Sequence, residues 1–322
     1  MATFTSHVCC VIIAIAAWDN PSAFAQSNQK IRIAALGGGL WTASQPLYCK
    51  ERGEFAKAGL DVDIVLTRGG SETVQAVITS SVDIGYQVGF NAVLAAQMRD
   101  AKIKIVSSGF AGNSDTYYYV RADSPIKSLN DLKGASVAYG RPGSVSEALL
   151  RALKSERGIE VKPVSGGNHD AIYTMTMTKQ IDVGMAVPPT GMAQLRKGEI
   201  RLLFDGNVIE SQRDVVNRVS IVGSVFLAEN RAAVTKFFRV LQGCIDWMYA
   251  NMKEGSKIYA AANKIDDELA ERALAFYPQS KSNFGPLTGM DEIIKEAVTD
   301  KFIERAPTPE QLKSFIDLVY QK

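Results

Sequence analysis

From residue 31 onward, apolar positions of this chain occur either in short runs typical of strands or at the spacing of a helix. Residues 31–36 form a short continuous apolar run, which is typical of a buried strand. Three glycines end the run, Pro46 suits a first helical turn, and residues 47–58 carry apolar side chains at helical spacing before Gly59. Residues 62–66 predict another strand. The order strand, loop, helix, strand predicts two parallel strands with a right-handed crossover.

The same pattern recurs in two blocks, which predicts an α/β protein with two lobes. In the first block we expect helices at 71–78 and 91–98 and strands at 81–85, 103–110 and 116–120. In the second block we expect strands at 135–139, 161–164, 181–187 and 200–204 and helices at 144–153, 169–178 and 191–196. Residues 218–227 again resemble a strand, and helices are expected from residue 229 to the end, at 269–277, 290–302 and 309–320 among others. One apolar stripe at helical spacing predicts core packing: Val234, Phe237, Phe238, Leu241, Ile245 and Met248.

Two serines mark candidate anion contacts. Ser71 and Ser144 each follow a glycine and open a predicted helix, Ser144 with Glu147 as a capping box. A helix start offers unpaired N–H groups and a partial positive charge, and across a two-lobe cleft the two starts would face each other. The alternative is that each serine only caps its helix. Arg141 adds a positive side chain beside Ser144, with a plain surface role as its alternative.

Further candidate contacts lie in loops that follow strands, where α/β sheets form their ligand crevice. The glycine run after residue 36 favours close backbone approach to a small ligand. It is not a nucleotide loop, because Thr42 and Ala43 stand where the fingerprint needs its third glycine. Trp41 could stack on a ligand or pack in the core, and Phe90 is more typical of packing. The full set of candidates is Gly38, Gly39, Leu40, Trp41, Gly70, Ser71, Tyr86, Gln87, Phe90, Asn113, Arg141, Gly143, Ser144, Val145, His169, Val187 and Pro188.

Catalytic and metal-ligating patterns are sparse. His169 stands beside Asp170, which would suit a base oriented by a carboxylate, but neighbouring residues on a helix point in different directions. No nucleophile motif accompanies it, so a helix-terminal or ligand-binding role is favoured over catalysis. We expect no catalytic residue, no metal and no cofactor.

Composition limits the class of protein. The 322 residues are 46% hydrophobic and 22% charged, which is ordinary for a globular chain with room for two domains. With 36 basic and 34 acidic residues and no basic stripe, a nucleic-acid partner is not expected. Residues 1–25 predict a signal peptide, because residues 8–18 are apolar and Ala23-Phe24-Ala25 is a cleavage site. The lack of Lys and Arg ahead of the apolar core leaves a tag-like N-terminus or a misplaced start codon as alternatives. No later stretch is long and apolar enough to span a membrane.

Cysteine usage leaves one question open. Cys9 and Cys10 would leave with the signal peptide, and Cys49 and Cys244 would remain. Each remaining cysteine lies in a helical apolar pattern, which favours two core thiols. A single disulfide between them after export is the alternative.

Several blocks resemble one family. The segments PLYCKERGEFAKAGLDVDIV, SSVDIGYQVGFNAVLAA, SPIKSLNDLKGASVAYGRPGS, KQIDVGMAVPPT and VFLAENRAAVTKFFRVL are similar to substrate-binding proteins of ABC importers, in the nitrate/sulfonate/taurine branch. The resemblance covers nearly the whole chain after residue 30. It implies a type II periplasmic binding fold with mixed sheets flanked by helices and a hinge. It places lobe 1 at 26–120 plus 222–322 and lobe 2 at 121–221, with the two chain crossings near 119–123 and 219–226.

The resemblance also implies a function. We expect a monomeric periplasmic protein that captures a small organic anion, a sulfonate or carboxylate, and delivers it to a membrane permease and its ATPase. The alternatives are an enzyme of the same fold and a sensory binding module without transport. A pyrimidine-pathway enzyme is disfavoured because its cysteine cluster is missing, whereas a menaquinone-pathway enzyme stays open through His169.

Overall fold

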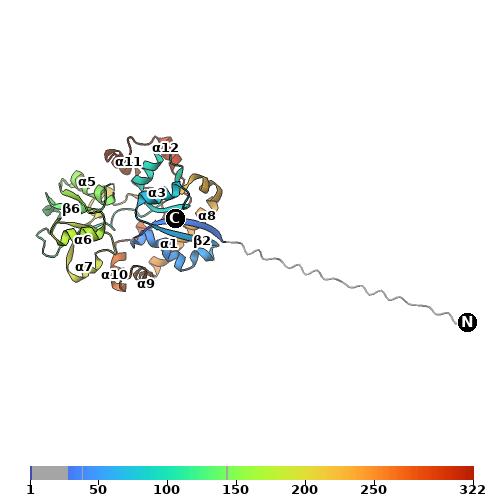
Figure 1. The fold of residues 1–322 in the computed structure, drawn as a ribbon, viewed down its shortest axis with the longest axis horizontal. Coiled ribbons are helices and arrows are strands. Elements are labelled where there is room, and N and C mark those ends of the chain that lie inside the picture. Colours follow the sequence, from blue (N-terminus) through green and yellow to red (C-terminus); the bar gives the residue numbers. More distant parts are fainter. Residues whose placement is uncertain (2–27, 38, 143) are drawn as a thin grey trace.

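The computed structural model describes residues 1, 28–37, 39–142 and 144–322. The predicted signal peptide and the candidate contacts Gly38 and Gly143 therefore lie outside the described residues, apart from Met1. Figure 1 shows two lobes: the middle third of the chain, in green and yellow, forms one, and the first and last thirds form the other. We call the latter lobe 1 and the former lobe 2.

Lobe 1 is built on a five-stranded mixed sheet in the order β2-β1-β3-β10-β4. Its strands are β1 (Gln29–Leu36), β2 (Leu60–Thr67), β3 (Ile84–Gly89), β4 (Ile103–Ser108) and β10 (Arg218–Gly223). The predicted pairing of the first two strands is confirmed, since β1 and β2 run parallel in register from Gln29–Leu60 to Leu36–Thr67. Strand β10 arrives from the far end of the chain and pairs antiparallel with both β3 and β4.

Lobe 2 holds two smaller sheets that meet at one bridge. One has the order β8-β5-β9, and the other pairs β6 with β7 in parallel. Their strands are β5 (Tyr117–Arg121), β6 (Ser136–Tyr139), β7 (Lys162–Ser165), β8 (Gly184–Ala186) and β9 (Ile200–Asp205). A bridge between Val137 and Val183 connects them. The strand order β7-β6-β8-β5-β9 therefore mirrors the layout of the lobe 1 sheet.

Helices flank the sheets of both lobes (Figure 1). In lobe 1 they are α1 (Trp41–Glu51), α2 (Glu54–Lys57), α3 (Gly70–Ile78), α4 (Phe90–Gln97), α8 (Ser224–Ala250), α9 (Met252–Asn263), α10 (Asp267–Leu274), α11 (Met290–Thr299) and α12 (Pro309–Phe315). In lobe 2 they are α5 (Val145–Arg157), α6 (His169–Met177) and α7 (Met192–Lys197). Short 3-10 turns lie at Leu129–Leu132, Gly206–Val208, Glu210–Gln212 and Gln279–Lys281.

The chain crosses between the lobes earlier than expected on both passes. Strand β5 pairs with β8 and β9, so Tyr117–Arg121 belongs to the lobe 2 sheet, ahead of the expected boundary at 120/121. Strand β10 pairs with β3 and β4, so Arg218–Gly223 belongs to the lobe 1 sheet, ahead of the expected boundary at 221/222. The crossings therefore precede these strands.

Three predicted local features differ from the structure. Helix α1 begins at Trp41, so Pro46 lies inside it and removes one helical hydrogen bond instead of opening the helix. Helix α3 is capped by the backbone at Gly69, and Ser71 is a helical residue with its side chain exposed, not the cap. The strand expected to reach residue 227 ends at Gly223, and α8 starts at once with a kink at Asn230.

The apolar core follows the predicted stripe on α8. All six of its residues are buried, and the Phe237 ring stacks on Phe55 of α2 with centroids 5.1 Å apart. Aromatic pairs of this kind contribute about 0.5–1.5 kcal/mol beyond their buried area. None of the helices in the described part of the chain is long and apolar enough to cross a membrane.

Candidate functional site

The loops predicted to form the crevice do face each other between the lobes. An added β-carbon at Gly69, the cap of α3 in lobe 1, would lie 3.8 Å from Nη1 of Arg141 in lobe 2. An added β-carbon at Gly39, ahead of α1, would lie 3.6 Å from Cδ of Pro189 in lobe 2. The candidate site is therefore the space between the helix starts of one lobe and the loops of the other.

Gly39 is held closely by its neighbours. Its φ of +76° is in the left-handed region, and an added β-carbon would lie 1.8 Å from Oδ1 of Asn263. The Asn263 side chain is itself fixed, because its Nδ2 donates to the carbonyl of Tyr259 at 2.9 Å and to the Tyr48 hydroxyl at 3.4 Å. Glycine is required here for both backbone and contact reasons.

The opposing loop of lobe 2 presents Arg141 and the start of α5. Arg141 is exposed, and its Nε donates to the carbonyl of Gly167 at 3.2 Å. Ser144 caps α5 and accepts a hydrogen bond from the Glu147 N–H at 3.4 Å, so its role as a cap is confirmed. Its hydroxyl also lies 2.9 Å from that of Ser146. The guanidinium therefore lies beside the N-terminus of α5, with Nη1 near Gly69 of the other lobe.

Five expected contacts are buried instead. Trp41, Tyr86, Gln87, Phe90 and Asn113 are each at most 2% exposed. Four of them make hydrogen bonds inside the protein. Trp41 Nε1 donates to the Tyr249 hydroxyl, and the Tyr86 hydroxyl donates to Gln45 Oε1. Asn113 Nδ2 donates to the Gln212 carbonyl, and Gln87 Oε1 accepts from the Phe110 N–H. Their burial favours a structural role for these side chains over direct contact with a ligand.

The other expected contacts differ in how far they are exposed. Leu40, Gly70, Val145, His169 and Val187 are all half-buried. Pro188 is buried, with its carbonyl accepting a hydrogen bond from the Tyr277 hydroxyl at 3.1 Å, which ties lobe 2 to lobe 1. Burial lowers the pKa of His169 despite the opposing effect of Asp170, so the imidazole is neutral at pH 7.

Two buried polar side chains behind the glycine loop were not predicted from the sequence. Gln45 and Tyr259 are at most 1% exposed, and in the described part of the chain neither Gln45 Nε2 nor the Tyr259 hydroxyl has a hydrogen-bond partner. Tyr259 packs edge-on against Trp41, with centroids 5.4 Å apart. Buried donors without partners are rare in folded proteins, so these two atoms distinguish the region behind the glycine loop from the rest of the core. Tyr259 and Asn263 were missed because their α9 is brought to the loop only by tertiary packing.

A cavity opens at one edge of the same region. It has a volume of about 610 Å³ and extends from Ser71 on α3, along α4, to Pro142 in the lobe 2 loop. Its wall is largely alanine and other aliphatic side chains, with the basic residues Arg99 and Lys301. Apolar walls and basic groups suit an anion with a hydrocarbon part.

Ion pairs close the rim between the lobes on two sides. Arg196 on α7 pairs with Asp266 at 2.7 Å and with Glu268 at 3.5 Å, both at the start of α10. On the other side Arg151 on α5 pairs with Asp300, which ends α11. All of these pairs join lobe 2 to lobe 1.

The two crossing segments are joined to each other. Arg218 Nη1 lies 2.8 Å from Asp115 Oδ2, and the Asp115 side chain is fully buried. Asn217 Nδ2 donates to Asn113 Oδ1 at 2.6 Å, and the Gly112 N–H donates to the Val215 carbonyl at 2.9 Å. The connection between the lobes is thus a pair of irregular segments joined by hydrogen bonds and an ion pair, an arrangement that suits a hinge.

Comparison with known proteins identifies the family. Residues 41–254 match the family described as NMT1/THI5 like, and the chain belongs to that family. A protein of Brucella abortus named as a binding protein is 27% identical over 250 residues, 76% of this chain and 75% of its own length.

Solved structures share the fold at low sequence identity. The periplasmic aliphatic sulphonate binding protein SsuA of Escherichia coli superposes with a TM-score of 0.73 at 17% identity, covering 91% of this chain and 94% of its own. The alkanesulfonate-binding protein SsuA of Xanthomonas axonopodis pv. citri, bound to MOPS, gives 0.70 at 18% identity, covering 90% and 98%. The predicted periplasmic binding fold is thereby confirmed.

The described residues contain no group of three or more His, Cys, Asp or Glu side chains placed to hold a metal ion.

Proposed function

We propose that this protein is the extracytoplasmic solute-binding component of an ABC importer and that it captures a small organic anion, a sulfonate or carboxylate, between its lobes. The observation that carries the proposal is the approach of Arg141 in lobe 2 to Gly69 at the start of α3 in lobe 1. A guanidinium and two helix starts on opposite walls form a positive environment for one anionic group. The sulfonate-binding proteins that share the fold support this ligand class.

The mechanism follows from the arrangement of the lobes. Ligand capture would rotate lobe 2 about the segments joined by Asp115 and Arg218 and hold the Arg141 loop against the Gly69 loop, as the two lie in this structure. The rim pair between Arg196 and Asp266, which is formed here, would favour the closed state. The closed protein would be the form that a membrane permease recognises, and the ligand would leave unchanged.

The first prediction concerns the anionic group. Arg141→Ala should weaken binding of the best sulfonate or carboxylate by about ten-fold to a hundred-fold, since a hydrogen bond to a charged group contributes roughly 1.5–3 kcal/mol. Isothermal titration calorimetry would compare benzenesulfonate and MOPS with benzoate and neutral benzamide. Mass spectrometry of the released ligand should find it unmodified.

A matched control lies on the same lobe. Arg157 at the far end of α5 is exposed and donates to the Val208 carbonyl at 2.7 Å, so Arg157→Ala removes a surface guanidinium away from the opening. It should leave the affinity within about two-fold, as surface substitutions usually have small effects. If Arg141→Ala binds as tightly as the parent, or only benzamide binds the parent, the anion proposal fails.

A further inference from the structure

Cys49 and Cys244 meet in the interior of lobe 1, although they lie far apart in the sequence. Cys49 is on α1 and Cys244 on α8, and both are buried, free thiols. Helices α1 and α8 pack against each other, and the two thiols interact closely enough to shift each other's pKa. The two sulfur atoms are therefore neighbours, and neither is needed for the ligand site proposed above.

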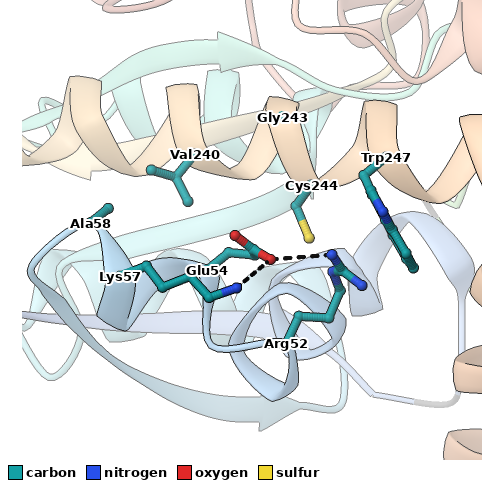
Figure 2. Close-up of a pocket in the computed structure, with 8 residues that line it drawn as sticks. All are labelled: Arg52, Glu54, Lys57, Ala58, Val240, Gly243, Cys244 and Trp247. Carbon is teal, nitrogen blue, oxygen red and sulfur yellow. Dashed lines mark hydrogen bonds and ion pairs between the residues drawn. The ribbon is translucent and has the colours of Figure 1, made fainter.

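A cavity gives access to one of the two thiols. It has a volume of about 480 Å³, and its wall includes Cys244, Arg52, Glu54, Lys57 and Trp247. Figure 2 shows the Cys244 sulfur pointing toward the Arg52 side chain, with α8 on one side and the chain from Arg52 to Ala58 on the other. Cys49 does not line this cavity. A small reagent would thus meet Cys244 first.

Charges around the cavity favour a thiolate at Cys244. The interaction with Cys49 lowers the pKa of Cys244, and the Arg52 guanidinium lowers it further, against burial and the Glu54 carboxylate. For Cys49 the direction is opposite, because its interaction with Cys244 and its burial raise its pKa. Arg52 is held in place by Glu54 at 3.2 Å and by the Trp247 ring, whose centroid lies 3.2 Å from the guanidinium carbon.

We propose that Cys244, Cys49 and Arg52 form a thiol–disulfide exchange site, in which Cys244 reacts with a small disulfide and Cys49 resolves the product into an intramolecular disulfide. The Cys244 thiolate attacks one sulfur of the reagent, a mixed disulfide forms, and one reagent thiolate leaves. Cys49 then gives its proton to water or to that thiolate and attacks the Cys244 sulfur, releasing the second reagent thiolate. Two protein thiols are oxidised and one disulfide reagent is reduced to two thiols.

The product would fix one wall of lobe 1. It would join α1, which begins beside the Gly39 loop, to α8, which begins directly after strand β10 of the lobe 1 sheet. A crosslink between such distant positions restricts the unfolded chain strongly. The oxidised protein should therefore resist unfolding better than the reduced one, and the reaction itself does not depend on the identity of the transported ligand.

The test uses the full chain with Cys9→Ser and Cys10→Ser as the parent, so that only Cys49 and Cys244 can react, and 2-hydroxyethyl disulfide at about pH 8. In the parent, intact-mass spectrometry should show loss of two hydrogens and no retained reagent, with a melting temperature raised by several degrees and restored by dithiothreitol. Cys49→Ser should retain one reagent half on Cys244, since nothing resolves it. Cys244→Ser should retain none on the same time scale, because Cys49 is buried and does not line the cavity.

The role of Arg52 has its own control. Arg52→Gln should slow adduct formation on the Cys49→Ser background by about ten-fold, because the thiolate loses its nearest positive charge. Lys57 also pairs with Glu54, at 3.0 Å, and lines the same cavity, so Lys57→Gln should leave the rate within about two-fold. Two free thiols in the treated parent, an adduct confined to Cys49, or a disulfide-linked dimer would each overturn the proposal.

Discussion

Individual residues decide how closely the loops of the candidate site approach the rest of lobe 1. Gly39 combines a left-handed backbone with direct contact to Asn263, whereas Gly59 has a similar φ of +74° and no heavy atom within 4 Å of an added β-carbon. A comparison of substitutions at these two glycines therefore distinguishes the cost of a left-handed backbone from the cost of steric contact. Only the first bears on the ligand site.

The residue-scale prediction uses this difference. Gly59→Ala should lower the free energy of unfolding by about 1 kcal/mol, the cost of placing a side chain at positive φ. Gly39→Ala should lower it by a further ~1–3 kcal/mol, because the new methyl group overlaps the fixed Asn263 amide. Urea denaturation would measure both variants against the parent.

A third variant shows whether contact is the cause. In a protein that already carries Asn263→Ala, the additional effect of Gly39→Ala should shrink to that of Gly59→Ala. Coupling of this kind is expected only between residues that touch. Equal losses in both backgrounds would mean that the strain comes from the backbone alone.

At the scale of elements, hydrophobic pattern predicted most strands and helices, and tertiary contacts explain the exceptions. The β1–α–β2 unit was recognisable because an apolar run, glycines and a helical stripe follow one another. The start of α1 could not be recognised from the sequence, because Thr42, Ser44 and Pro46 are weak helix formers. They become helical only when buried between the sheet and α8.

The sequence pattern predicted parts of the candidate site, as it predicted most strands and helices. Positions at strand ends were recognisable, so Gly39, Gly70, Arg141 and Ser144 fall where expected. The strand expected at 81–85 is β3 at Ile84–Gly89 in the structure, so Tyr86 and Gln87 lie inside a buried strand and not in the loop after it. The ligand-site prediction as a whole stays a prediction.

The contact of α11 with α5 and the turn Glu210–Gln212 provides an element-scale prediction. Burial raises the pKa of Glu296 to about 7; Asp300 and Glu156 act in the same direction, while Arg151 and the hydrogen bond from Gln212 oppose it. Between the ordinary carboxyl pKa and about 7, the folded protein binds a proton that the unfolded chain releases. Stability due to this group is therefore present at low pH and is lost as the pH rises through that window.

Glu296→Gln should remove this dependence. The free energy of unfolding of the variant, relative to the parent, should rise by about 1–2 kcal/mol from about pH 5 to about pH 8, after allowing for screening of a half-buried side chain. Glu292→Gln, exposed on the same helix, should show no such trend. A difference that is flat with pH would show that Glu296 titrates normally.

At the scale of the whole molecule, two kinds of contact connect the lobes. The connection between the lobes contains a buried pair, Asp115 with Arg218, which keeps the two crossing segments together. The rim contains more exposed pairs, such as Arg196 with Asp266 and Glu268, that can form only when the lobes are close. Buried pairs are costly to break, whereas exposed ones contribute at most about 1 kcal/mol. We therefore expect the buried pair to maintain the architecture and the rim pairs to adjust the balance between the proposed open and closed forms.

The last prediction concerns that balance. Arg196→Gln removes both rim pairs to α10 and should lower the closed population, weakening anion binding by about two-fold to five-fold, mostly through faster release. Lys197→Gln on the same helix is the control, because Lys197 pairs with Glu199 within its own lobe, at 3.9 Å.

Calorimetry would give the affinities, and small-angle scattering should show a smaller radius of gyration for the parent with ligand than without. Because the rim pairs are exposed, high salt should reduce the difference between parent and Arg196→Gln. An unchanged radius at saturation would contradict hinge closure, and equal affinities for Arg196→Gln and the parent at low salt would remove the rim pairs from the mechanism.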